Sequence, residues 1–169
     1  PLSDPTAILE DLQNRRQQDF PALSDLTAQT VQCDIQDVDA GLETYSSPAF
    51  YMLPPIDALM QNTIRINRSS TADGIELYTT LAHEGYPGHL YQTVYFREHI
   101  QNPLAALLTG SGANEGWATY VEQLSYFYDN GLSAETSAYQ AAMRSFSLCF
   151  HSLLDIGINY DGWSKDRAA

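Results

Sequence analysis

The fold of the chain is organised around the segment Leu81-Ala82-His83-Glu84-Gly85-Tyr86-Pro87-Gly88-His89-Leu90-Tyr91-Gln92. Within it, His83 and His89 are two of the four histidines of the chain, and a carboxylate, Glu84, directly follows the first. Apolar residues at helical spacing on both sides predict that the segment belongs to a long helix. Imidazole and carboxylate groups bind divalent metals and transfer protons, so this segment is also the first candidate for chemistry.

The His-Glu pair resembles the zincin motif His-Glu-x-x-His, in which two histidines on one helical face bind zinc and the glutamate is the general base. The spacing differs, because His89 lies six residues after His83 and Pro87 occupies the position of the second histidine of the motif. Six residues at about 100° each would place the two imidazoles about 120° apart on a straight helix. A straight helix would therefore not let them share one metal.

Pro87 prevents a straight helix at this point. It has no N–H to donate to the carbonyl of His83, and its ring clashes there. Gly85 and Gly88 let the backbone kink or widen, and a widened turn that absorbs two extra residues would bring the histidines face to face. We therefore predict a modified zincin helix, kinked at the active site, that binds a metal through His83 and His89. The alternative is a kinked core helix with ordinary hydrogen-bonded histidines.

The composition is that of one globular domain. The 169 residues suffice for a substantial core, and 44% of them are hydrophobic. The net charge of −13 argues against nucleic acid and anionic membrane surfaces as partners, because both attract a basic face. Cys33 and Cys149 are too few and too far apart for a disulfide framework, and no apolar run approaches the length of a membrane span.

Both ends of the chain suggest a fragment. It begins at Pro1 without a methionine, and it stops one turn after Ser164, which has the character of a helix cap. We therefore interpret residues 1–169 as a single domain, the C-terminal catalytic fragment of a longer protein. The missing targeting signal then has no meaning for localisation.

The first half of the chain combines helix and strand patterns. A helix capped by Asp4-Pro5 is predicted to run to about Phe20, and Pro21–Leu26 fits one further short turn. Three short runs then show the spacing and composition of strands, namely Val31–Ile35, Phe50–Leu53 and Thr63–Asn67. We expect a small sheet that packs against helices.

The second half is predicted to be helical. The helix that contains the motif opens at Asp73-Gly74 and ends near Asn102-Pro103, and His99 lies close to its end, where a cation favours the helix dipole. A Gly-rich loop at Gly110–Asn114 leads into a third helix, from Glu115 to about Gly131. A fourth helix, capped by Ser133, runs to Leu154, and Asp155–Trp163 leads out of it. The predicted fold class is mostly α (α+β), a zincin-like helical domain with a small β-sheet.

A catalytic zinc needs three protein ligands and one open position, so the two histidines need a third partner. Glu115 is the best candidate, since it follows His89 by 26 residues and stands at the start of the next predicted helix. The alternative for Glu115 is a glutamate that complements the helix dipole. Glu122, two turns further along, is a candidate for supporting the ligands or for a place on the surface.

Glu84 is the predicted general base, which takes a proton from the attacking water and delivers it to the leaving amine. The reaction also needs a donor to the developing oxyanion. Asp155 either orients a ligating imidazole or caps its helix, and Cys149, in an apolar helix, is predicted to be inert core. The candidate donors, of which we select the first two, are His151, Tyr160, Tyr139 and Tyr120.

Three segments together resemble the bacterial domain-of-unknown-function 885 family, in which they occur in the same order. They are His83–His89, Glu115–Glu122, and Asp155–Asn159 with Gly162-Trp163-Ser164. The resemblance covers roughly Phe50 to the end of the chain. It implies a largely helical zinc peptidase related to the zincins, with a peptide as substrate and with export or a lipid anchor in some members. The implied zinc ligands are His83, His89 and Glu115, and the implied base is Glu84.

The chain departs from the family pattern at three positions. Many members have histidine where Leu90 stands, arginine where His151 stands and histidine where Asn159 stands. If those residues bind substrate or the oxyanion, this branch has altered specificity or has lost activity. We expect a missing N-terminal part to form much of the cleft wall, so that the fragment alone binds metal without hydrolysing a substrate.

Three functions are consistent with the sequence. The first is zinc-dependent hydrolysis of peptide bonds. The second, from a different class, is a catalytically inactive helical binding or scaffold module that retains the zincin-like shape. The third is metal-dependent hydrolysis of a non-peptide amide by the same site. Metal content separates the second function from the other two, and substrate screening separates the first from the third.

Overall fold

The computed structural model describes residues 3–55, 57–71, 74–102, 104–105 and 110–168, with the side chains of Leu26 and Gln29 left aside. Within these ranges the chain forms two compact units, Pro1–Asn130 and Gly131–Ala169. The expectation of a single domain stays a prediction. The predicted helix boundaries at Asp73 and Pro103 lie outside the described residues.

The first two helices begin with polar caps. The Asp4 carboxylate accepts a hydrogen bond of 3.2 Å from the N–H of Ala7 at the start of α1 (Pro5–Asp19), as the sequence predicts. Ser24 caps α2 (Asp25–Thr30) in the same way. One stripe of α1 is buried and anchors the helix to the core through Ile8, Leu9 and Leu12.

The three predicted strands form one sheet. β1 (Gln32–Asp37), β2 (Ala49–Met52) and β3 (Gln61–Ile66) have the order β1-β3-β2, with β1 parallel and β2 antiparallel to the central strand. A short 3-10 helix, η1 (Glu43–Tyr45), lies between β1 and β2 in the chain. Alternation along β3 buries every second side chain, so that one face of the sheet faces the core through Asn62, Ile64 and Ile66.

The segment predicted as one kinked helix forms two helices, α3 (Ile75–Glu84) and α4 (His89–His99). The four residues Gly85–Gly88 separate them, and the Tyr86–Pro87 peptide bond is cis. The prediction that Pro87 prevents a straight helix is right, but the prediction of one continuous, kinked helix is wrong. Pro87 has no N–H for the helical ladder, and the chain starts a new helix after the interruption.

Two further boundaries differ from the prediction. α5 (Ser111–Ser125) includes most of the predicted Gly-rich loop, with Gly110 as its N-cap residue. α6 (Ala134–Asn159) starts at the predicted Ser133 cap but extends to Asn159, into the segment predicted to lead out of it. A hydrogen bond of 2.7 Å from the Asn159 side chain to Asp155, one turn earlier, accompanies this extension. α7 (Lys165–Ala168) follows.

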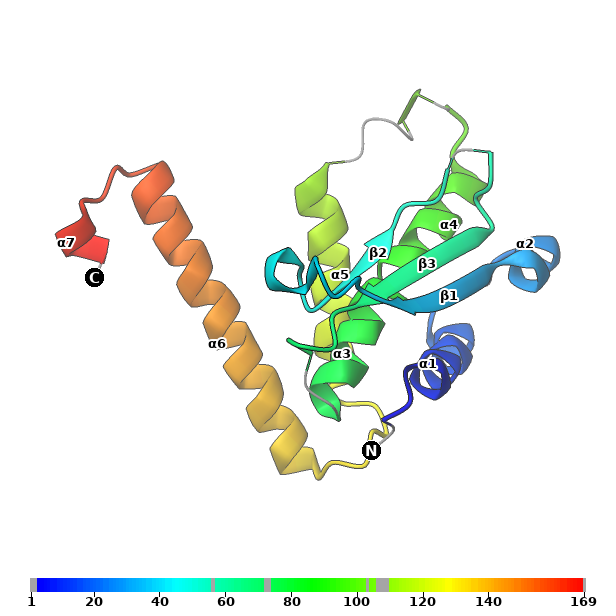
Figure 1. Ribbon diagram of the computed structural model, residues 1–169, viewed down its shortest axis with the longest axis horizontal. Helices are drawn as coiled ribbons and strands as arrows, with labels where there is room; N and C mark the ends of the chain where they lie inside the picture. The colour runs from blue at the N-terminus through cyan, green and yellow to red at the C-terminus, as the bar shows by residue number, and fades with distance from the viewer. Residues whose placement is uncertain (1–2, 56, 72–73, 103, 106–109, 169) are drawn as a thin grey trace. The chain divides into compact units, whose positions relative to one another are not determined.

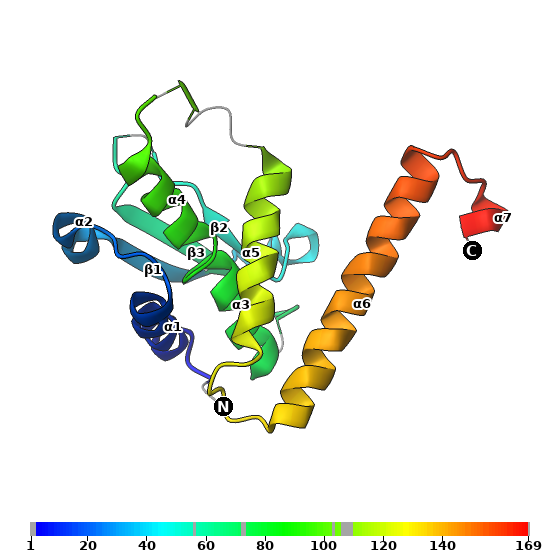
Figure 2. The same ribbon diagram turned by 180° about the vertical axis from the view of Figure 1, so that it is seen from behind.

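The helices of the first unit cover the sheet. Figure 1 shows α3, α4 and α5 behind the sheet, and Figure 2 shows the same helices in front of it. Helix α3 is central, because it packs against α1, α5 and β2. Its fully buried side chains Leu77 and Leu81 meet Ile64 of β3 and Ile8 of α1 in one hydrophobic core. The site residues near the end of α3 are therefore attached to the central helix of this unit.

The fold class is confirmed: the described residues are mostly helical with a small three-stranded sheet. Among them, no helix combines the length and the apolar character that a membrane crossing requires. Cys149 is exposed, so its predicted place in the core is wrong. It lies on α6, and few side chains of this helix are buried among the described residues.

Candidate metal centre

The two histidines lie on either side of the interruption between α3 and α4. His83 is in the last turn of α3, and His89 is the first residue of α4. The N–H of Gly85 donates to the carbonyl of Leu81 at 2.9 Å and closes the last turn of α3. The first helical bond of α4 follows at once, from Gln92 N–H to the carbonyl of Gly88 at 2.9 Å. The four-residue connection thus replaces the widened turn that the sequence predicts.

Gly88 makes the close return of the chain possible. A Cβ atom at this position would overlap the carbonyl oxygens of His83 and Ala82. At Gly85, a Cβ atom would lie 2.5 Å from Leu9 Cδ1 and 2.8 Å from the carbonyl oxygen of Leu81. The connection therefore needs both glycines because it has no space for a side chain, in addition to the backbone freedom that glycine provides.

His83, His89 and Glu115 converge on one point. The Nε2 atom of His83 lies 3.4 Å from one carboxylate oxygen of Glu115, and Nε2 of His89 lies 3.5 Å from the other. One donor atom from each residue lies within 4.8 Å of the other two. Tetrahedral zinc with bonds near 2.1 Å would separate its ligand atoms by about 3.4 Å. The donor set and its spacing therefore fit a zinc ion.

Glu122 supports His83 from behind. The Nδ1–H of His83 donates to Glu122 Oε2 at 3.0 Å, and this leaves Nε2 directed at Glu115. The carboxylate of Glu122 is almost fully buried, with 6% of the side chain exposed. Burial alone would lower the pKa of His83, but the hydrogen bond to Glu122 and the nearby carboxylates raise it. Of the two places that the sequence allows for Glu122, the structure shows the supporting one.

His89 has the opposite electrostatic environment. Burial lowers its pKa, and the positive charge of a protonated His83 lowers it further. The two rings are close, with centroids 4.9 Å apart and planes at 87°. Neutral imidazole is the form that binds metals, and the lowered pKa of His89 favours that form.

Glu84 is held by the edge of the sheet. The backbone N–H of Tyr51, in β2, donates to Glu84 Oε2 at 2.8 Å. Burial raises the pKa of Glu84, although the charge of His83 and the bond from Tyr51 act in the opposite direction. A carboxylate with a raised pKa, next in sequence to a candidate metal ligand, is a candidate general base.

Comparison with known proteins assigns the chain to a family. Residues 2–169 match the family model described as "Bacterial protein of unknown function (DUF885)". The chain belongs to this family. No functionally curated protein matches the sequence of this DUF885 chain.

A solved structure with the same fold is among the matches. It is the crystal structure of a protein from Colwellia psychrerythraea described as a "putative lipoprotein", with a TM-score of 0.73 and 18% sequence identity. The match covers 98% of the DUF885 chain and 28% of the Colwellia chain. The chain thus spans a little over a quarter of the length of this structural neighbour, and the likeness concerns the fold alone.

The predicted oxyanion donors are spread over both units of the DUF885 chain. Tyr120 is exposed on α5, and Tyr139 is exposed on α6. His151 lies on α6, where its Nδ1–H donates to the carbonyl of Ser147 at 2.7 Å. Tyr160 directly follows α6 and is 88% exposed. The catalytic roles selected for His151 and Tyr160 stay predictions.

Two of the remaining assignments are resolved locally. Asp155 accepts a hydrogen bond from Asn159, and both residues lie inside α6. Asp155 therefore does not cap the end of the helix. His99 is the last residue of α4, and its Nδ1–H donates to the carbonyl of Tyr95 at 2.8 Å. This position agrees with the predicted interaction of His99 with the helix dipole.

Sequence reasoning missed two supports of the site. The indole N–H of Trp117 donates to the buried carbonyl of Pro87 at 2.9 Å and ties α5 to the connection between the histidines. Tyr51 contributes only its backbone N–H to Glu84, and a backbone contact leaves no trace in the identity of the residue. Trp117 could have been noticed, since it stands two residues after Glu115 in the segment that carries the family resemblance.

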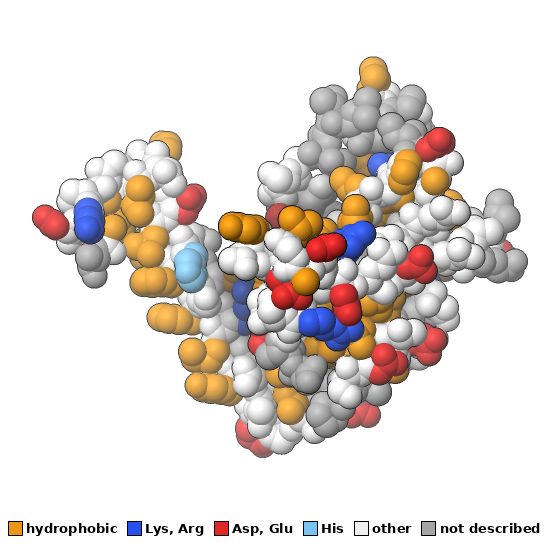
Figure 3. All heavy atoms as spheres, viewed as in Figure 1, with side chains coloured by type: hydrophobic (Ala, Val, Ile, Leu, Met, Phe, Trp, Pro, Cys, Tyr) orange, Lys and Arg blue, Asp and Glu red, His pale blue; other side chains and the backbone are white. Residues whose placement is uncertain are grey.

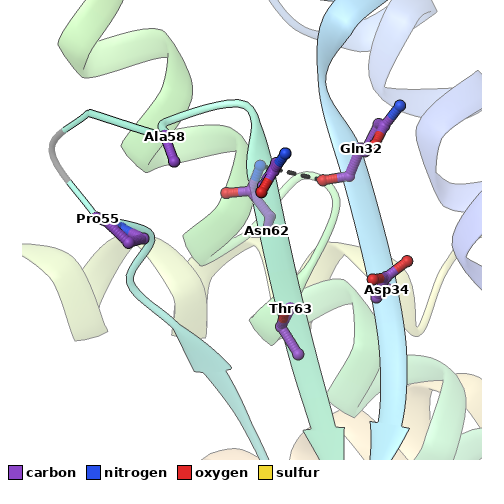
Figure 4. Close-up of a pocket in the computed structure, with 7 residues that line it drawn as sticks. Gln32, Asp34, Pro55, Ala58, Asn62 and Thr63 are labelled. Atoms are coloured by element: carbon purple, nitrogen blue, oxygen red, sulfur yellow. Dashed lines mark hydrogen bonds between the residues drawn. The ribbon is translucent and has the colours of Figure 1, made fainter.

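A separate hollow lies at the start of β1 and β3. Its volume is about 420 Å³, and Figure 4 shows the Asn62 side chain donating to the carbonyl of Gln32 at its wall, at 3.2 Å. Its lining is Gln32, Asp34, Pro55, Ala58, Gln61, Asn62 and Thr63. None of the predicted site residues belongs to this lining, so the hollow is distinct from the candidate metal centre.

Proposed function

We propose that the protein is a zinc-dependent peptidase and that residues 1–169 form its catalytic part. The observation that carries the proposal is the convergence of His83, His89 and Glu115 within 4.8 Å, beside the half-buried carboxylate of Glu84. Two neutral imidazoles and one carboxylate are a ligand set of catalytic zinc sites, which keep a fourth position open.

His83, His89 and Glu115 would hold the zinc ion. Bound zinc would supply a Lewis acid that polarises a peptide carbonyl and increases the acidity of water. Glu122 would fix the tautomer and the orientation of His83, because a carboxylate on Nδ1–H directs the free electron pair of Nε2 to the metal.

Glu84 would transfer the proton. Its Oε2 accepts from Tyr51 N–H, and we assign to Oε1 the removal of a proton from the attacking water and its delivery to the leaving amine. The raised pKa of Glu84 suits both steps, since the group must gain and then lose a proton near neutral pH. His151 and Tyr160 remain our candidate donors to the oxyanion.

The proposed substrate is a peptide, and the proposed location is outside the cytoplasm. The second proposal is supported only by the description of the Colwellia structure as that of a "putative lipoprotein". Zinc-dependent hydrolysis of a non-peptide amide would use the same residues, and a helical binding module without activity would need none of them.

The first experiment measures zinc per chain in the full-length protein, purified without chelator. We expect near-stoichiometric zinc, and its loss in the His83→Ala/His89→Ala double variant. The matched control is His99→Ala, which changes an exposed histidine on α4 and should keep the zinc. A wild-type protein that takes up no zinc, even when zinc is supplied, would favour the inactive binding module.

The second experiment tests catalysis with Glu84→Gln in the full-length protein. Hydrolysis of a fluorogenic peptide library should fall by about 10²–10⁴-fold, while the zinc content should not change. Glu10→Gln is the control, since Glu10 is an exposed carboxylate on α1. Full turnover in Glu84→Gln would exclude the proposed base. A zinc-loaded wild type that cleaves amides but no peptide would favour the non-peptide hydrolase.

A further inference from the structure

Helix α6 has an apolar side that the other described residues of its own unit, Gly131–Ala169, leave exposed. The helix has 26 residues, and six large apolar side chains between 46% and 66% exposed follow one another at spacings of three or four residues. These residues, here called the α6 apolar face, are Tyr139, Met143, Phe146, Phe150, Leu153 and Ile156. Figure 3 shows hydrophobic side chains in a row along this helix.

The α6 apolar face is continuous. At about 100° per residue, its six members fall within about 140° of the helix circumference. Cys149, which is exposed, lies within the same arc. The other side of the helix carries polar and charged residues, namely Gln140, Arg144, Ser147, His151 and Asp155. This segregation is typical of a helix that buries one side against another element.

The size and composition of the face argue that it is covered in the working protein. Monomeric soluble proteins rarely expose a contiguous apolar patch of more than a few hundred Å². Three of the six members are aromatic and the others are aliphatic or methionine, as in a protein core. The face contains no lysine or arginine, and the net charge is −13, so contact with an anionic lipid surface is disfavoured.

We propose that the α6 apolar face packs against a segment of the same polypeptide that lies outside residues 1–169. The length of the structural neighbour supports this occupant. In the Colwellia protein, the fold of these residues makes up 28% of the chain, and the match extends over 98% of the present sequence, including α6. A fold of this kind thus exists next to a large amount of further chain. The proposal does not rest on the proposed peptidase activity.

The test uses photo-cross-linking in the full-length protein. p-Benzoylphenylalanine replaces Phe146 in one variant and Phe150 in a second, because both changes keep an aromatic ring on the face. The matched control places the same group at Gln140, on the polar side of α6. We expect irradiation of the two face variants to give an intramolecular cross-link to a segment outside residues 1–169, and we expect this product to be lost in the control.

Every other result would overturn the proposal. A covalent dimer would show that a second copy covers the face, and a cross-link within residues 1–130 would show that the first unit does. Cross-linking to lipid would identify a membrane surface. An absence of any cross-link in both face variants would show that the face is exposed to solvent. Peptide mapping by mass spectrometry distinguishes the expected cross-link from the dimer, from the cross-link to residues 1–130 and from the lipid adduct.

A charge variant provides a second measurement. Phe146→Asp should lower the melting temperature of the full-length protein, because a carboxylate would be buried without a partner. Gln140→Asp, on the polar side, should leave the melting temperature unchanged. Equal melting temperatures for wild type and Phe146→Asp would contradict the proposal, whether or not the cross-linker can be incorporated.

Discussion

Glu122 and His83 lie 39 residues apart in sequence and form a hydrogen bond of 3.0 Å that sets the orientation of the imidazole. The bond joins α5 to the last turn of α3, and one side of α5 brings the buried Glu122 and the exposed Glu115 to the histidines together. Two glutamates seven residues apart on one helix face thus meet the same imidazole, one at Nδ1 and one at Nε2.

This relationship leads to a prediction for Glu122→Gln. The amide can still accept the hydrogen bond from Nδ1, but it no longer provides the negative charge that increases the basicity of His83. We expect zinc affinity to fall by about 10-fold or more, measured by competition with a chromophoric chelator. Glu10→Gln is the control with an exposed carboxylate. An unchanged zinc affinity would show that Glu122 does not support the ligand.

Gly88→Ala should disrupt the connection between α3 and α4. The added Cβ would overlap the carbonyl oxygens of His83 and Ala82, which are backbone atoms and cannot move aside alone. We expect the free energy of unfolding to fall by about 2 kcal/mol or more, measured by urea denaturation, and zinc binding to be lost with it.

Gly112→Ala is the matched control for that change. Gly112 lies in the first turn of α5, where a Cβ would meet no atom within 4 Å. The substitution should stabilise the protein by about 0.5 kcal/mol, since alanine loses less backbone entropy than glycine in a helix. Equal effects of the two substitutions would mean that the close approach at Gly88 is not required.

The residue types of the site could be predicted from the sequence, but their supports could not. His83, His89 and Glu115 are identified by chemistry and spacing, because zinc sites draw on few residue types. The return of the chain at Gly88 depends on a clash with the backbone of the preceding turn, which becomes visible only when α3 and α4 are placed in space. The contact of Tyr51 with Glu84 uses a backbone N–H, which every residue except proline has.

Secondary structure shows the same limit. The strands were predictable because alternation along β3 reflects one buried face. The helix ends were less predictable, since α5 begins at Gly110-Ser111 without a side-chain cap. Near the end of α6, the Trp163 ring lies against Gly157 so closely that a Cβ atom would not fit, and sequence patterns do not reveal such a contact.

The thiol of Cys33 should react slowly with alkylating agents. Burial raises its pKa to about 12, and the neighbouring carboxylate of Asp34 adds to the effect. The thiolate is the reactive form, so alkylation near pH 8 should be about 1,000-fold slower than for an ordinary thiol, and its rate should rise about tenfold per pH unit. Iodoacetamide labelling of a Cys149→Ser variant measures this rate. A plateau of the rate above pH 9 would contradict the raised pKa.

Trp117→Phe should weaken the candidate metal centre through its carbonyl contact. The substitution keeps an aromatic ring in place but removes the N–H that donates to the buried carbonyl of Pro87. An unpaired buried carbonyl costs about 1–3 kcal/mol, so urea denaturation should show a loss of this size, and zinc affinity should fall because Pro87 lies between the two histidines. Trp163→Phe is the control, since the N–H of Trp163 has no hydrogen-bond partner among the described residues. For Trp163→Phe we expect a smaller loss of stability than for Trp117→Phe and an unchanged zinc affinity. If the two variants lose stability equally and both keep zinc, the bond from Trp117 does not support the site.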